Sequence, residues 1–137
     1  AQNKIFDNRS PEFGGGAPGT TAVNYSTDRD YGGSSGFQVG STYKIFTLLE
    51  WLEQGRGLNE VVDTTRNRLP QSAFTDTCDD GGGPWGGTWP VGNFGAARPA
   101  LSVWDATVES VNTAFASMAE QLDLCEIRRT AEAVGVH

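Results

Sequence analysis

The sequence predicts a mainly helical part of one domain, and three observations lead to that prediction. At 137 residues, the chain fits a single domain or a portion of one. Apolar residues recur at helical spacing directly after Ser41 and again through the last third of the chain. The segments in between are rich in glycine and proline, which interrupt regular structure. We therefore expect helices at 41–54 and within 102–134, separated by loops.

A loop-rich segment precedes the first predicted helix. Residues 1–40 contain many Gly, Pro, Asn and Asp residues, so we expect loops there, with one short strand at 21–25. After Ser41, apolar side chains recur at i, i+3, i+4 and i+7, which predicts one buried helical stripe made of Ile45, Leu48, Leu49 and Leu52. Gly55 supplies the C-terminal stop.

Residues 56–101 are expected to return to irregular structure. The run 81–87 consists mainly of glycine and is too flexible for a regular element. A loop of this length indicates either a function or a packing partner that these residues lack.

Three short helices are predicted in the last third of the chain. Ser102 and Asp105 have the spacing of a helix-capping pair, so the first helix is expected to begin at 103 and to end close to Ser110. The second is expected at 113–122, and its inward stripe consists of Ala114, Phe115, Met118 and Leu122. The third is expected at 126–134, ended by the glycine that follows.

Charge and composition argue against several classes of partner. The formal net charge of −7 opposes the phosphate attraction that supplies most nucleic-acid affinity. No stretch approaches the roughly 20 apolar residues that cross a bilayer. The two cysteines, Cys78 and Cys125, with the single histidine His137, are too few for a zinc site, so no metal or other cofactor is predicted. The cysteines are either two separate buried thiols or one disulfide.

The strongest chemical signal is the pair Ser41 and Lys44 at the start of the first predicted helix. One helical turn separates them, so an amine can take the proton of a hydroxyl if burial disfavours the ammonium. Unpaired N–H groups at the helix start can face an oxyanion, and Gly40 lets a substrate carbonyl come close. The alternative is a serine N-cap and a solvated lysine. Only one other lysine, Lys4, occurs in a chain that otherwise uses arginine, which favours a base.

A second pair, Ser110 and Asn112, lies at the predicted junction between two helices. On a short turn, a hydroxyl and an amide can both point into a cleft. The alternative is a pair of capping residues that starts the next helix.

Together, segments 36–44 and 110–112 resemble the first two motifs of penicillin-binding proteins. They read Gly-Phe-Gln-Val-Gly-Ser-Thr-Tyr-Lys and Ser-Val-Asn, and related signatures occur in β-lactamases and penicillin-binding proteins. Flanking residues extend the resemblance over nearly the whole chain. The chain is most similar to the N-terminal and central portion of the transpeptidase domain of class A, bifunctional members of an actinobacterial type.

This resemblance implies an α/β fold of the β-lactamase/transpeptidase type and a serine acyl-enzyme. Ser41 would attack the penultimate D-Ala of a peptidoglycan stem peptide, Lys44 would take its proton, and β-lactam antibiotics would acylate the same oxygen. Ser110 would relay protons between Lys44 and the leaving amine, and Asn112 would bind the amide of the substrate backbone. The enzyme would act at the extracytoplasmic face of the bacterial cell membrane, where we expect the two cysteines to form a disulfide.

One part of the family pattern is missing from the chain. The third motif, Lys-Thr-Gly on a strand that lines the cleft, does not occur in the sequence. We therefore expect residues 1–137 to form part of a transpeptidase domain, mainly its helical part without most of the sheet. A second chain or fragment would supply the sheet and the third motif. Membrane attachment would come only from an N-terminal anchor outside the chain.

Two other functions compete with this interpretation. A β-lactamase or β-lactam sensor would use the same Ser41 and Lys44 and would differ in whether water removes the acyl group. A secreted, non-catalytic glycan-binding module would instead use aromatic side chains as sugar-stacking platforms, namely Tyr31, Trp85, Trp89 and Trp104. The second alternative leaves the two motifs unexplained.

Overall fold

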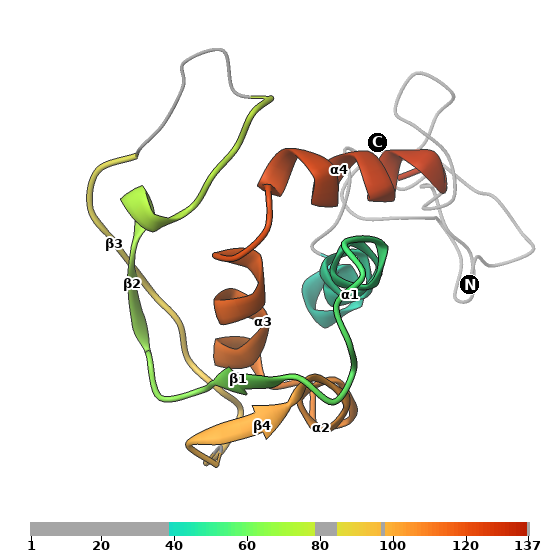
Figure 1. The fold of residues 1–137 in the computed structure, drawn as a ribbon. Coiled ribbons are helices and arrows are strands. Elements are labelled where there is room, and N and C mark those ends of the chain that lie inside the picture. Colours follow the sequence, from blue (N-terminus) through green and yellow to red (C-terminus); the bar gives the residue numbers. More distant parts are fainter. Residues whose placement is uncertain (1–38, 79–84, 97, 137) are drawn as a thin grey trace, which may run out of the picture. The chain divides into compact units, whose positions relative to one another are not determined.

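The fold is that of a computed structural model, which describes residues 39–78, 85–96 and 98–136. The chain divides into two compact units, 1–40 and 41–137, and nearly all described residues belong to the second. In the described part of this second unit, short helices and two small antiparallel sheets alternate along the chain (Figure 1). This architecture alone does not identify a larger fold, so the α/β transpeptidase-like class stays a prediction.

The elements follow one another closely along the chain. After a 3₁₀ turn at Gly40–Tyr43, the helices are α1 (Lys44–Glu53), α2 (Val103–Val108), α3 (Asn112–Ala119) and α4 (Leu124–Ala133). The strands are β1 (Val61–Asp63), β2 (Arg68–Pro70), β3 (Thr88–Pro90) and β4 (Ala100–Ser102), and a second 3₁₀ turn lies at Gln71–Ala73. None of the helices in the described ranges is long and apolar enough to cross a membrane.

Helix α1 forms where the sequence predicts it, but it buries a different face. Ile45 and Leu52, expected in the buried stripe, are 45% and 41% exposed. The buried residues of α1 are Phe46, Thr47, Glu50 and Trp51. The reason is tertiary, because α1 packs against both α3 and α4 and turns this face toward them. Gly55 ends the helix as predicted, in the left-handed conformation with φ +75°.

The segment 56–101 is more regular than the sequence predicts, because it contains parts of two antiparallel strand pairs. Strand β1 pairs with β4, and Val62 opposite Leu101 is buried. Strand β2 pairs with β3, and Leu69 of this pair packs against Val91 and Ala116. Each strand is only three residues long, which is too short for an alternating pattern to be visible. The strand expected at 21–25 lies outside the described residues.

The three C-terminal helices are confirmed, with shifted ends for two of them. The hydroxyl of Ser102 accepts a hydrogen bond from the N–H of Asp105 at 3.0 Å, and α2 begins where predicted and ends at Val108, two residues before Ser110. Helix α3 begins one residue earlier than expected and ends at Ala119, but its predicted inward residues are all buried. Helix α4 starts two residues early because the Asp123 carboxylate accepts from the N–H of Cys125 at 2.9 Å.

A disulfide between Cys78 and Cys125 joins the β2–β3 region to α4, with Cα atoms 5.1 Å apart. Hydrogen bonds from the backbone N–H and hydroxyl of Thr77 to Asp123 support the same junction, at 3.1 and 2.6 Å. Asp76 lies beside the two sulfurs, but paired sulfurs do not serve as thiolate ligands.

Candidate active site

Ser41 lies in the 3₁₀ turn that leads into α1, and its side chain is exposed. Gly40 precedes it with φ +55°, a left-handed conformation that favours glycine. Among the described residues, no atom lies within 4 Å of a Cβ atom added at Gly40. The backbone conformation therefore favours glycine here, although no described neighbour would clash with a side chain.

Lys44, the first residue of α1, reaches across to the turn between α2 and α3. Its Nζ donates to the backbone oxygen of Ser110 at 2.6 Å, to the Oγ of Ser110 at 3.0 Å, and to the Oδ1 of Asn112 at 2.5 Å. Three acceptors therefore match the three N–H bonds of the ammonium. The structure brings both predicted motifs into one cluster.

Ser110 stands out because it adopts the left-handed conformation, with φ +53°, and is the one non-glycine residue among those described that does so. This conformation costs roughly 1–2 kcal/mol for a residue with a side chain. Two backbone hydrogen bonds hold the turn, from Ser110 to Thr107 at 3.1 Å and from Val111 to Ala106 at 3.0 Å. The turn presents both the carbonyl and the hydroxyl of Ser110 to Lys44. Strain retained in this way is typical of functional sites.

Asn112 is the first residue of α3, and both ends of its side-chain amide are engaged. Its Oδ1 accepts from Lys44, and its Nδ2 donates to the backbone oxygen of Gly92 at 2.5 Å. One N–H and one lone pair of the amide remain for a ligand. The predicted alternative, in which Ser110 and Asn112 merely cap a helix, does not describe these contacts.

Burial lowers the pKa of Lys44 below its ordinary value of 10.5. The ring of Phe115, whose centroid lies 5.4 Å from Nζ, attracts the ammonium and opposes this lowering. The two carbonyl oxygens that accept from Nζ favour the ammonium and work against the desolvation. A hydroxyl can accept from the ammonium or donate to the free amine, so the Oγ of Ser110 suits both protonation states.

A cavity of about 380 Å³ adjoins this cluster. Its lining comes from α1, α2 and the start of α3 and consists of Ser41, Thr42, Lys44, Ile45, Leu48, Thr107, Ser110 and Phe115. Ile45 and Leu48 thus face the cavity, which accounts for the partial exposure of the predicted stripe. Among the described residues, Ser41 makes no hydrogen bond to Lys44. Ser41 and Lys44 therefore line one cavity without a hydrogen bond between them.

Two residues that support the site were missed in the sequence. Gly92 and Asn93 lie between β3 and β4 and contact the first residues of α3. The only local signal is a turn-forming Gly-Asn pair, which does not indicate what it contacts.

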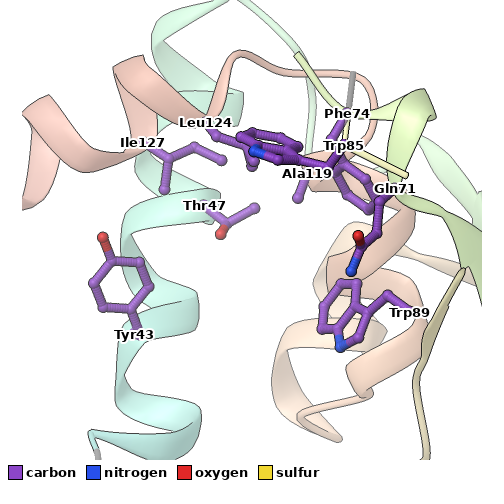
Figure 2. Close-up of a pocket in the computed structure, with 9 residues that line it drawn as sticks. All are labelled: Tyr43, Thr47, Gln71, Phe74, Trp85, Trp89, Ala119, Leu124 and Ile127. Atoms are coloured by element: carbon purple, nitrogen blue, oxygen red, sulfur yellow. The ribbon is translucent and has the colours of Figure 1, made fainter. Parts of the chain in front are cut away.

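A second cavity, of about 540 Å³, lies between α1 and the β2–β3 pair and is largely apolar (Figure 2). Trp85 and Trp89 line it together with Phe74, whose ring stands edge-on to Trp89 at 5.9 Å. Trp104 is not among its lining residues, and Tyr31 lies outside the described residues. Of the three described aromatic residues expected for a glycan platform, two therefore line this cavity, and Trp104 does not.

Comparison of the chain with protein-family models, curated proteins and solved structures found no match.

Proposed function

We propose that this chain carries the nucleophile-bearing part of a peptidoglycan D,D-transpeptidase. It would act through an acyl-serine on stem peptides ending in D-Ala-D-Ala and would be inhibited by β-lactams. The supporting observation is the contact of Lys44 with both Ser110 and Asn112. These two residues of the second motif lie 66 and 68 positions after Lys44 in the sequence, and both contact its amine. Ser41 lines the cavity beside that amine.

Acylation follows from these positions. The Oγ of Ser41 attacks the carbonyl carbon of the penultimate D-Ala, and its proton passes to the neutral amine of Lys44. The tetrahedral intermediate then loses the terminal D-Ala by cleavage of the C–N bond. The departing amine takes a proton from the Oγ of Ser110, which regains one from Lys44. The acyl group remains as an ester on Ser41.

Deacylation uses the same groups in reverse. In cross-linking, an amine of a second stem peptide attacks the ester, its proton passes through Lys44, and the Oγ of Ser41 recovers its hydrogen. If water attacks instead, the result is carboxypeptidase activity. In both cases the Asn112 amide, which keeps one N–H beyond its bond to Gly92, would hold the peptide backbone of the donor.

A β-lactamase that used the same Ser41 and Lys44 would differ in how the acyl group is removed, since class A β-lactamases use a glutamate to activate the deacylating water. Rapid turnover of a chromogenic cephalosporin by the complete protein would favour that alternative over a transpeptidase.

Exposed apolar side chains support the proposal that a second chain or fragment completes the domain. Trp104 and Val108 lie one turn apart on α2 and are 57% and 69% exposed. Together with Ile45 and Leu52 on α1, they offer apolar surface that a sheet would cover. This partner would supply the Lys-Thr-Gly strand with a second set of oxyanion donors. The complete enzyme would act outside the cytoplasm, held to the membrane by a separate anchor.

Release of D-Ala from a stem pentapeptide by the complete protein tests the proposed function. We expect the wild type to release D-Ala and Ser41→Ala to lose this activity. Ser72→Ala is a matched control, since Ser72 is exposed and lies outside the cavity. Equal release by wild type and Ser41→Ala would contradict the proposal.

A further inference from the structure

The first turn of α3 lacks a capping side chain of its own. Its N-cap position is occupied by Val111, which makes no side-chain cap. Asn93, which lies 20 residues earlier in the sequence, takes this role: its Oδ1 accepts from the backbone N–H of Thr113 at 3.0 Å. Its Nδ2 donates to the Oγ1 of Thr113 at 2.9 Å. Since Thr113 is 2% exposed, water cannot readily replace these bonds.

The neighbouring residue, Gly92, fixes the orientation of the Asn112 amide. Its carbonyl accepts from Nδ2, so Oδ1 is directed to the ammonium of Lys44. A flipped amide would turn N–H groups toward Nζ and an oxygen toward the Gly92 oxygen, and both contacts would repel. The pair Gly92–Asn93 therefore holds both Asn112 and the residue after it.

On its N-terminal side this loop is anchored in the core. Val91 is buried and its N–H donates to the Asn67 oxygen at 2.9 Å. On the other side, Phe94 is exposed and Gly95 adopts φ +120°. Among the described residues, the hydrogen bonds of Asn93 to Thr113 are the last that hold this loop before the carbonyl of Arg98, which accepts from Thr64.

We propose that Asn93 is a positioning residue: it holds the Gly92 carbonyl against the start of α3 so that Asn112 stays directed at Lys44. This role rests on the proposed acyl-transfer function, because it acts on the amine that serves as base. Asn93 does not line the active-site cavity, so its effect passes through Asn112 and Lys44.

Acylation of the complete protein by benzylpenicillin tests this role. We expect Asn93→Ala to lower the first-order acylation rate about 10- to 100-fold, the effect of a misplaced catalytic group, with little change in the concentration for half-maximal rate. Asn93→Asp should restore most of the rate, because its carboxylate still accepts from the N–H and hydroxyl of Thr113. Asn59→Ala, in an exposed loop, is the matched control and should acylate as the wild type does.

Thr113→Val gives an independent measure that leaves Asn93 in place. It removes the Oγ1 contact and keeps the bond to the backbone N–H, so we expect a several-fold loss of rate. If Asn93→Ala does not fold, a Thr113→Val protein that acylates at the wild-type rate overturns the inference. Unchanged rates in Asn93→Ala, or no recovery in Asn93→Asp, also overturn it while the proposed function stands. A wild type that is never acylated would contradict the proposed function itself.

Discussion

The Nζ of Lys44 lies 3.0 Å from the Oγ of Ser110 and 2.6 Å from its backbone oxygen, although the two residues are 66 positions apart. Ser110 makes these contacts from a left-handed turn, and Lys44 from the first residue of a helix. Their relationship links the protonation of the lysine to the geometry of the turn. Separate experiments test the charge of Lys44, the strained turn at Ser110 and the disulfide.

Replacing Lys44 with arginine tests whether the side chain acts as a base. A guanidinium remains protonated in proteins, so Lys44→Arg keeps the charge but cannot accept the proton of Ser41. We expect the rate of acylation by benzylpenicillin to fall about 10²- to 10⁴-fold, the usual contribution of a general base. Lys4→Arg is the matched control at the only other lysine. Similar rates for Lys44→Arg and the wild type would exclude lysine as the base.

The pH dependence of acylation follows from the burial of Lys44. Because the pKa of this amine is lowered below 10.5, the fraction of neutral amine increases as the pH rises. The neutral amine already becomes the major form at a pH below 10.5. We expect the acylation rate to increase with pH and to reach half of its maximum below pH 10.5. A stopped-flow pH profile with benzylpenicillin measures this midpoint. A rate that falls as pH rises through this range would argue against a lysine base.

The strained turn predicts opposite effects on stability and activity at Ser110. Ser110→Gly relieves the left-handed conformation, and we expect it to raise the free energy of unfolding by up to about 1 kcal/mol. It also removes the relay hydroxyl, so acylation should slow by about 10²-fold. Ser110→Ala should lose activity to the same extent without becoming more stable. Chemical denaturation and acylation kinetics measure the two effects, and a Ser110→Gly variant with full activity would eliminate the relay role.

The disulfide is expected to stabilise the packing of α4. For a sequence separation of 47 residues, closing the loop restricts the unfolded chain by about 4 kcal/mol in the entropic account. The double variant Cys78→Ala, Cys125→Ala should therefore unfold at lower denaturant concentration, by a difference of that order. The wild type treated with reductant serves as the control and should unfold at the same denaturant concentration as the double variant. Equal stability of the oxidised and reduced wild type would show that the disulfide adds nothing to the free energy of unfolding.

Local sequence signals predicted the helices well, because each of them depends on neighbours in the chain. The cap of Ser102 on Asp105 and the buried stripe of α3 are such cases. The buried face of α1 was predicted wrongly, because packing against α3 and α4 selects Phe46 and Trp51 over Ile45. The four short strands were missed because three residues cannot display a period.

The residues of the candidate site were predicted, but only some of their contacts. Motif spacing indicated Ser41 and Lys44, and the resemblance implied that Ser110 exchanges protons with Lys44. Lys44 does contact Ser110, whereas no hydrogen bond joins it to Ser41. Gly92 and Asn93 could not be found, because their role depends on a loop that returns to the start of α3. Contacts of this kind are tertiary and leave no periodic signal.

Covalent labelling by benzylpenicillin is the most direct test of the central claim, that Lys44 makes the hydroxyl of Ser41 an acyl acceptor. The complete protein is incubated with the antibiotic, its intact mass is measured, and the adduct is located by peptide mapping. We predict one stable penicilloyl group on the peptide that contains Ser41, and none in Ser41→Ala. An unmodified protein, or an adduct on another residue, would contradict the account.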